Sequence, residues 1–177
     1  MTAEPTDVPQ DEQRLSAVLV ACLEAIDEGR PVDRQGLLAR HPEVEARVRD
    51  EIAAVTGGAP LAPEHVEALA YTRQTLQEPM RLYPPAFGFT RFAIASDEMG
   101  GYPVPATSVI FLSAYCTHRH TAFWEEPEVF DPQRFAPERA AGRPRFAYFP
   151  FGGGPRQCIG NTFAMMEAQL EIGRAHV

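Results

Sequence analysis

The sequence contains no lysine: all 16 basic residues are arginine, against 24 acidic residues, which gives a formal net charge of -8. An acidic chain repels phosphates on average, so this balance argues against non-specific binding to nucleic acid or to an anionic membrane. Cysteine is scarce too, with three residues at wide spacings. Such spacing suits a reducing compartment better than a disulfide framework. We therefore expect no nucleic-acid partner and no disulfide.

A long apolar run is also missing. The N-terminus is acidic and has no basic residue before Arg14, and its longest apolar run, residues 17–23, stops at Glu24. A signal peptide needs a positively charged start, and a membrane-spanning helix needs about 20 apolar residues. The sequence therefore predicts no signal peptide, no membrane segment and a cytoplasmic location.

Aromatic residues are absent from the first 70 positions, because all 11 Phe, all 5 Tyr and the single Trp lie at or after Tyr71. Proline is unevenly spread as well, since 11 of the 17 prolines lie between Pro79 and Pro155. A proline-rich stretch favours short elements joined by turns over a long helical bundle. The chain thus divides into two unlike parts.

Residue periodicity predicts a mainly α fold with a small antiparallel β part (α+β). Helical patterns cover residues 15–26, 33–38, 41–55, 63–82 with a break near Tyr71, and 159–171. Alternating patterns predict an antiparallel pair of strands at residues 91–95 and 107–113, separated by turn-forming residues at 97–101. Residues 114–154 are expected to be mostly irregular, and long irregular segments are commonly functional.

The densest chemical signal is a glycine-rich run that opens a helix and contains a cysteine, Phe151-Gly-Gly-Gly-Pro-Arg-Gln-Cys158-Ile-Gly160. Free N–H groups at the start of a helix stabilise a thiolate, which is the form of cysteine that binds metals. Glycine allows a flat ligand to approach the backbone closely. Arg156 is placed to reach a carboxylate at the edge of that ligand. A buried, inert cysteine beside a flexible turn is the alternative.

The run matches every fixed position of F-x-x-G-x-R-x-C-x-G, and so resembles the haem-binding signature of the cytochrome P450 family of haem-thiolate monooxygenases. The resemblance implies that haem b (iron protoporphyrin IX) is the cofactor and that Cys158 is its axial metal ligand. Phe151 would lie against the haem near the sulfur. Two glycines, Gly154 and Gly160, complete the implied cofactor-binding set with Arg156.

A second pattern lies on the helix predicted over residues 63–82. Glu78 and Arg81 are spaced i,i+3, which by itself is typical of a surface pair. However, Glu78-x-x-Arg81 followed by Leu-Tyr-Pro-Pro resembles the E-x-x-R helix of the same family, and residues 130–135 resemble the segment that supplies a third member. The resemblance implies a structural triad of Glu78, Arg81 and Arg134. Pro79 inside this turn predicts a kink, since proline costs about 3 kcal/mol in a regular helix.

Arg91 lies ten residues after Arg81, where the family has a contact to a haem propionate. Arg91 and Arg156 together would provide two guanidinium groups for the two haem carboxylates. The planar guanidinium group suits the geometry of a carboxylate better than an ammonium group does. A strand arginine that faces water is the alternative for Arg91.

A rival hypothesis concerns Cys116, His118 and His120. If this segment is extended, its period of two places the three side chains on one side as a partial zinc site. A second, non-enzymatic alternative is a helical interaction module at residues 1–40 joined to a non-functional remnant. Residues 15–41 resemble the helical segment that precedes some bacterial serine/threonine kinase domains.

The P450 resemblance covers about residues 37–169 and corresponds to the C-terminal portion of that fold. We expect three regions: a helical segment of uncertain origin (1–40), the haem-binding portion (41–171) and a non-native tail (172–177). No residue matches the family's catalytic proton relay, so a truncated chain with impaired or no turnover is expected. The missing membrane anchor predicts a bacterial protein. The implied reaction inserts one oxygen atom from O2 into a small apolar organic substrate, with an electron-donor redox protein or reductase as partner.

Overall fold

Helix α3, Pro42–Thr56, opens the part of the chain that the structure describes, residues 41–175 of a computed structural model. Its buried face is formed by Val44, Val48 and Ile52, which recur every four residues. The helix ends at Gly57, whose φ of 61° lies in the left-handed region that favours glycine. The helix predicted over residues 41–55 is confirmed.

The next helical stretch is broken, as expected, into the 3₁₀ helix η1 (Pro63–Ala68) and helix α4 (Ala70–Leu82). Leu69 at the break makes no capping hydrogen bond with its side chain. Instead, the carboxylate of Glu51 on α3 accepts hydrogen bonds from the N–H groups of Tyr71 and Thr72, at 2.7 and 2.8 Å, and from the Thr72 hydroxyl. A helix N-terminus favours a negative charge. The start of α4 is therefore held by α3.

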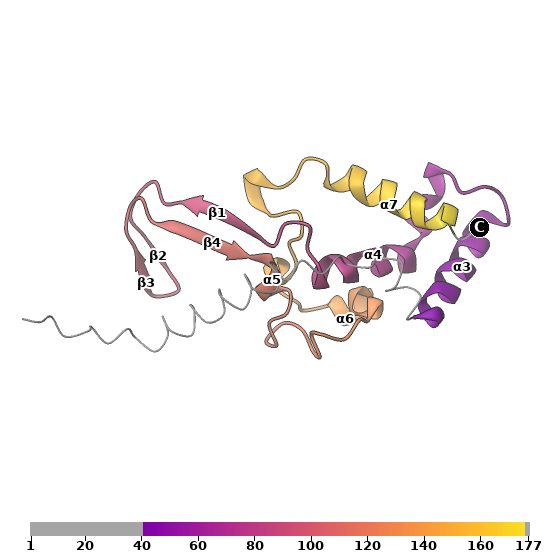
Figure 1. Ribbon diagram of the computed structural model, residues 1–177, viewed down its shortest axis with the longest axis horizontal. Helices are drawn as coiled ribbons and strands as arrows, with labels where there is room; N and C mark the ends of the chain where they lie inside the picture. The colour runs from indigo at the N-terminus through magenta and orange to yellow at the C-terminus, as the bar shows by residue number, and fades with distance from the viewer. Residues whose placement is uncertain (1–40, 176–177) are drawn as a thin grey trace, which may run out of the picture. The chain divides into compact units, whose positions relative to one another are not determined.

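Helix α7, Asn161–Ala175, lies alongside α4 and completes a small apolar core with α3 (Figure 1). Leu170 and Ile172 of α7 pack against the buried cluster of Val44, Val48, Ile52, Leu61, Leu69 and Tyr71. At Gly173 a Cβ atom would lie 2.0 Å from the Leu61 side chain, so only glycine allows this approach. The helix predicted over residues 159–171 is confirmed with shifted bounds, because it begins at Asn161 and ends at Ala175.

The β part consists of two antiparallel pairs. Strands β1 (Gly88–Phe92) and β4 (Val109–Ser113) pair with Gly88 opposite Ser113, which confirms the antiparallel pair. The bounds predicted for its first strand, residues 91–95, are wrong, because β1 begins three residues earlier and ends at Phe92. The prediction that residues 97–101 form only a turn is wrong, since β2 (Asp97–Met99) pairs with β3 (Tyr102–Val104). Gly100 and Gly101 join these strands with φ of 60° and 87°, the positive values that a type I′ hairpin turn needs.

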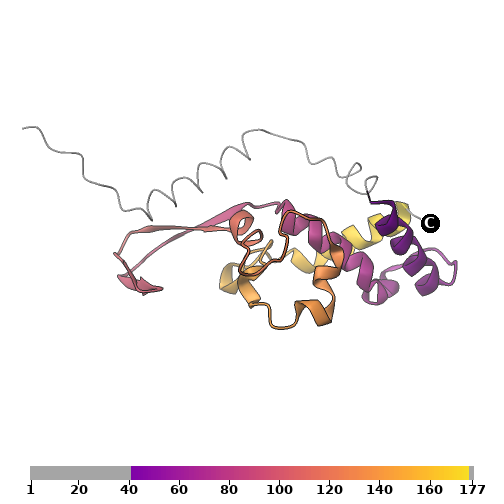
Figure 2. The ribbon, with the colours of Figure 1, turned by 90° about the horizontal axis from the view of Figure 1, so that it is seen from below.

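Between β4 and α7 the chain is mostly irregular, as predicted for residues 114–154, and its helices are very short. They are α5 (Ala114–Thr117), η2 (Pro132–Phe135), α6 (Pro137–Ala140), η3 (Arg145–Ala147) and η4 (Gly154–Arg156). The view from below shows this orange segment looping beside α4, against which η2 packs (Figure 2).

The mainly α fold with a small antiparallel β part is confirmed for the described residues. The helices predicted within residues 15–38 and the kinase-like resemblance of residues 15–41 lie outside the described residues, apart from His41. The same holds for the proposed 1–40 region and for residues 176–177. The division into regions at 1–40, 41–171 and 172–177 stays a prediction.

Candidate functional site

Glu78 and Arg81 form a fully buried ion pair on the last turns of α4. The Arg81 guanidinium donates through Nε to Glu78 Oε2 at 2.8 Å and through Nη2 to Glu78 Oε1 at 2.7 Å. Both side chains have 0% exposure. Helix α4 runs through Pro79 without interruption, so the proline does not prevent the bidentate contact. A buried carboxylate and guanidinium in this geometry satisfy each other's strongest hydrogen bonds.

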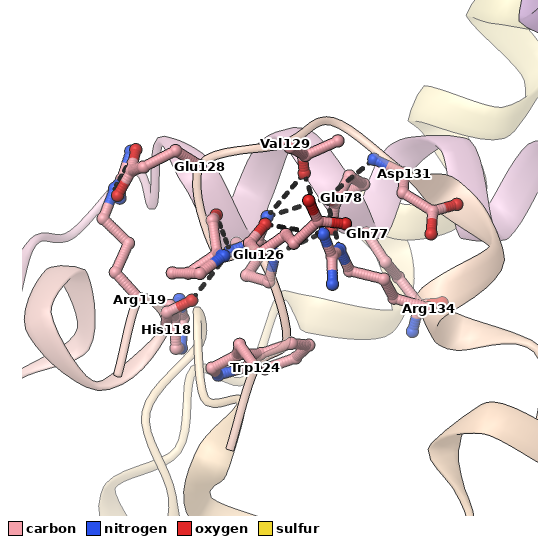
Figure 3. Close-up of polar contacts among 12 residues, drawn as sticks. Gln77, Glu78, His118, Arg119, Trp124, Glu126, Glu128, Val129, Asp131 and Arg134 are labelled. Carbon is pink, nitrogen blue, oxygen red and sulfur yellow. Dashed lines mark hydrogen bonds and ion pairs between the residues drawn. The ribbon is translucent and has the colours of Figure 1, made fainter. Parts of the chain in front are cut away.

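Arg134 on η2 joins this pair from a segment more than 50 residues away. Its Nε lies 3.4 Å from Glu78 Oε1, and the side chain is 4% exposed. The N–H of Asp131 donates to the same carboxylate oxygen at 3.0 Å. Figure 3 shows Glu78 and Arg134 reaching toward one another below the backbone of Val129 and Asp131. The structure therefore brings together all three residues of the expected triad.

Backbone carbonyls compensate the excess positive charge of this cluster. Arg81 donates to the carbonyls of His118 and Pro127, at 2.9 and 2.7 Å. Arg134 donates to the carbonyl of Glu125 and, at 2.7 Å, to that of Glu126. Glu126 has a φ of 42°, a strained value for a residue other than glycine, and its carbonyl accepts the hydrogen bond from Arg134. The two guanidiniums thus fix the path of residues 118–129.

Aromatic rings enclose the cluster. Trp124 is 1% exposed and has the guanidinium carbons of Arg143 and Arg81 at 4.1 and 5.2 Å from its ring centre. Tyr148 donates its hydroxyl hydrogen to the carbonyl of Gln77 on α4 at 3.1 Å. Burial raises the pKa of Tyr148 far above its usual value, with the Glu78 charge acting in the same direction and Arg81 opposing it. Tyr148 therefore stays protonated and keeps its bond to α4.

His118 connects the cluster to the segment that leads to Cys158. Its ring is fully buried, and its Nε2 accepts the N–H of Phe149 at 2.8 Å. Burial lowers the pKa of His118 from 6.5 to about 4. The backbone of Arg81 opposes this shift, whereas the charges of Arg81 and Arg119 add to it. The ring is therefore neutral at ordinary pH, as an accepting Nε2 requires.

The cysteine loop, residues 149–158, is closed by backbone hydrogen bonds. The N–H of Gly152 donates to the Phe149 carbonyl, and the N–H of Cys158 donates to the Phe151 carbonyl, both at 2.9 Å. Gly152 and Gly154 have φ of 72° and 68°, values that favour glycine. At Gly153 a Cβ atom would lie 2.6 Å from the ring of Phe146. The glycines of this run therefore allow the backbone to turn tightly and to pass close to Phe146.

Cys158 itself lies at the surface, three residues before α7 begins. Ile159 beside it is fully exposed, and Phe163 on the first turn of α7 is 63% exposed. Arg156 is exposed and has no hydrogen-bond or ion-pair partner among residues 41–175. A thiol, apolar side chains and an unpaired cation thus stand together at one end of the loop without partners in the described part of the chain.

Arg91 lies on β1, on the same face of the strand as Phe89, because side chains two residues apart share a face. The Phe89 ring lies 3.6 Å from the position of a Cβ atom at Gly152, in the cysteine loop. This contact places one face of β1 against the loop. Among residues 41–175, the hydrogen-bond partner of the Arg91 side chain is the neighbouring carbonyl of Thr90, at 2.8 Å.

The zinc hypothesis receives no support. Its premise of an extended segment is wrong, because residues 114–117 form helix α5. His118 Nε2 is occupied by Phe149, and His120 Nδ1 accepts the N–H of Ala122 at 3.1 Å. Within residues 41–175 no group of three or more His, Cys, Asp or Glu side chains is placed to hold a metal ion.

A groove of about 570 Å³ lies between η1, α4, α7 and the cysteine loop. Its lining includes Met80, Gly152 and Met165 but not Cys158. Phe151, which belongs to the implied cofactor-binding set, lines this groove as well.

Among residues 41–175, none of the helices combines the length and the apolar character of a membrane span.

Comparison with known proteins shows the family of the chain. A profile described as Cytochrome P450 matches residues 36–174. Cyclooctatin synthase of Streptomyces melanosporofaciens is 43% identical over 136 residues, which are 77% of this chain and 30% of that protein. Pentalenene oxygenase of Streptomyces avermitilis is 38% identical over 136 residues, with the same shares. Thromboxane-A synthase of Mus musculus is 39% identical over 139 residues, 77% of this chain and 26% of that enzyme.

The chain therefore belongs to the cytochrome P450 family. It spans about 30% of the length of the first two of these relatives. Because the relatives come from bacteria and from an animal, the predicted bacterial origin stays a prediction.

Haem is the cofactor that this family implies, and the residues around Cys158 fit it. A macrocycle with a metal at its centre and carboxylates at its edge needs a ligand atom, apolar contacts and cations. The exposed sulfur of Cys158, the fully exposed Ile159 and the unpaired Arg156 offer these three kinds of group.

Proposed function

We propose that this chain carries the haem-binding segment of a haem-thiolate monooxygenase, with Cys158 as the axial ligand of haem b. The observation that carries the proposal is the exposed Cys158 at the end of a glycine loop closed by backbone hydrogen bonds, in a chain of the cytochrome P450 family. Bound haem supplies the activation of dioxygen, and a thiolate ligand favours cleavage of the O–O bond.

The residues of the chain have separate tasks in this proposal. Cys158 would hold the iron, Phe151 would lie against the haem near the sulfur, and Gly154 and Gly160 would allow the haem to approach the backbone closely. Arg156 and Arg91 bind the two carboxylates at the edge of the haem. The triad of Glu78, Arg81 and Arg134 fixes residues 118–129 and, through them, the approach to the cysteine loop. None of the described residues is assigned a catalytic role in proton transfer.

Substrate, electron donor and location remain proposals for the whole enzyme. We propose an apolar organic substrate that receives one oxygen atom from O2, an electron-donor redox protein or reductase, and a cytoplasmic location. The 177-residue chain itself is expected to turn over slowly or not at all. Measurable oxygenation by the purified chain with an electron donor would contradict this last expectation.

The test is reconstitution of the purified chain with haemin, followed by a carbon-monoxide difference spectrum and a metal assay. The wild-type chain is expected to give a thiolate-type band. Cys158→Ser should lose that band, whereas the matched variant Cys116→Ser should keep it, because Cys116 lies on α5 outside the loop. A band that survives in Cys158→Ser, or stoichiometric zinc without iron, would refute the proposal.

The two arginines are tested by the affinity for haemin. Arg156→Gln and Arg91→Gln should each raise the Kd about five-fold, since an exposed ion pair contributes up to about 1 kcal/mol. Arg174→Gln is the charge-matched control, because Arg174 lies near the end of α7 and pairs with Glu171. Equal effects of all three substitutions would show a general effect of charge and would contradict the assignment of carboxylate contacts.

A further inference from the structure

His118 is in contact with both the buried polar cluster and the cysteine loop. Its backbone carbonyl accepts a hydrogen bond from Arg81 Nη1 at 2.9 Å. Its ring Nε2 accepts the N–H of Phe149, the first residue of the loop, at 2.8 Å. No other described residue receives a hydrogen bond from both Arg81 and the loop backbone.

Packing leaves the His118 ring little freedom. The ring is 0% exposed and has the rings of Tyr148 and Phe149 at centroid distances of 5.1 and 5.2 Å, the second edge-on. Its Nδ1 is buried without a hydrogen-bond partner in the described part of the chain. The hydrogen bond that the ring makes is therefore the one at Nε2, with the N–H of Phe149.

The bond at Phe149 continues toward Cys158 through the loop backbone. The Phe149 carbonyl accepts the N–H of Gly152, and the Phe151 carbonyl accepts the N–H of Cys158. Both backbone polar groups of Phe149 are therefore fixed, one by His118 and one within the loop. A displacement of His118 would move the residue from which the closed part of the loop starts.

We propose that His118 is a positioning residue for Cys158: its imidazole holds the Phe149 N–H and so transmits the position of the Glu78–Arg81 pair to the cysteine loop. The effect on the backbone of residues 149–152 does not depend on a ligand. The effect on the sulfur as a ligand rests on the haem function proposed above.

Two substitutions separate the hydrogen bond from the packing of the ring. His118→Phe keeps an aromatic ring against Tyr148 and Phe149 but removes the acceptor. His118→Gln removes the ring but places an amide oxygen near the position of Nε2. If the acceptor positions the loop, glutamine should restore what phenylalanine loses.

The first measurement is amide hydrogen exchange in the haem-free chain. His118→Phe should speed the exchange of the Phe149 amide about ten-fold or more relative to the Ile52 amide in α3. The reason is that loss of one hydrogen bond changes an opening equilibrium constant by about ten-fold. His118→Gln should return most of that protection. Unchanged exchange in His118→Phe, or equal acceleration in both variants, would overturn the proposal.

The second measurement is the carbon-monoxide difference spectrum after reconstitution. His118→Phe should lower the fraction of thiolate-type band at equal haem content, and His118→Gln should restore it; no difference between them would overturn the effect on the sulfur. If the wild-type chain gives no such band, the haem proposal fails while the exchange result still decides the role of His118. If His118→Phe does not fold, the hydrogen bond is tested in the wild-type chain by NMR, as a scalar coupling between the Phe149 nitrogen and His118 Nε2. The absence of this coupling would refute the hydrogen bond.

Discussion

The Glu78 cluster and the cysteine loop differ in where their polar and apolar groups find partners. In the cluster, Glu78 and Arg81 are fully buried and bound to each other, to Arg134 and to backbone carbonyls. In the loop, backbone hydrogen bonds join Gly152 to Phe149 and Cys158 to Phe151, but the side chains of Arg156, Cys158 and Ile159 are exposed to solvent. The cluster therefore serves folding, whereas the loop end offers groups to a ligand. His118 lies between the two.

This contrast predicts that stability and ligand binding depend on different residues. Breaking a buried ion pair leaves charges without solvent or partner, which is strongly destabilising. Changing an exposed side chain without partners has a small effect on folding. Substitutions at the Glu78 cluster should thus mainly lower stability, whereas substitutions near Cys158 should mainly weaken haem binding.

Glu78→Gln should have the largest effect. It leaves the guanidiniums of Arg81 and Arg134 buried without their carboxylate, and we expect a loss of about 3–5 kcal/mol in the free energy of unfolding. Urea unfolding followed by circular dichroism measures it. The matched control is Glu128→Gln, because Glu128 pairs with Arg119 at 3.3 Å on the surface and should contribute less than about 1 kcal/mol. Similar losses in both variants would contradict the contrast.

The second-largest effect should come from lowering the pH, which should reduce the free energy of unfolding through protonation of His118. Its pKa is about 4 in the folded chain and 6.5 when free of the fold, so the unfolded chain binds more protons between these values. The contribution of His118 to stability is complete above pH 6.5 and is lost as the pH falls toward 4. The difference corresponds to a loss on the order of 3 kcal/mol.

Urea unfolding at pH 7, 6, 5 and 4 measures this dependence, and His118→Gln should remove its part of the slope. The charged groups near the ring include Arg81 on α4 and Arg119 beyond α5. Both positive charges disfavour protonation of the His118 ring. If wild type and His118→Gln show the same slope between pH 6.5 and 4, His118 is not the group that titrates.

Glu51→Ala should have an intermediate effect, because it removes a cap and leaves the cluster intact. Glu51 accepts three hydrogen bonds at the start of α4, and we expect a loss of about 1–2 kcal/mol in the free energy of unfolding. Asp50→Ala, at the neighbouring exposed position of α3, should change it by less than about 0.7 kcal/mol. The cap assignment is wrong if the two variants are equally stable.

The sequence predicted those parts of the fold that depend on local patterns. The apolar spacing of Val44, Val48 and Ile52 predicts α3, and Pro63 with the break near Tyr71 predicts the division between η1 and α4. The β2–β3 hairpin was missed, since Asp97, Glu98 and Met99 are all exposed and show no apolar alternation. Their pairing depends on the positive φ of Gly100 and Gly101 rather than on burial.

The site was predictable from motif and family resemblance, but its connections were not. Glu78, Arg81 and Arg134 meet as expected, although Pro79 lies inside the helix that presents them. The contacts of Glu51 with Tyr71 and of His118 with Phe149 join residues 20 and 31 positions apart. Neither separation follows a helical or strand period, so only the tertiary fold identifies these pairs.

Cys158→Ser should have the smallest effect on stability, because the side chain is exposed and its backbone bond to Phe151 does not involve the sulfur. Without haem, its free energy of unfolding should match the wild type within about 0.5 kcal/mol. With haemin at about 100 times its Kd, the wild type should gain about 2.7 kcal/mol, since a ligand that binds only the folded state stabilises it. Under the same conditions, Cys158→Ser should gain clearly less than Cys116→Ser. Equal gains would show that haemin binds elsewhere, and a large loss in the absence of haemin would show that Cys158 belongs to the folding part of the molecule.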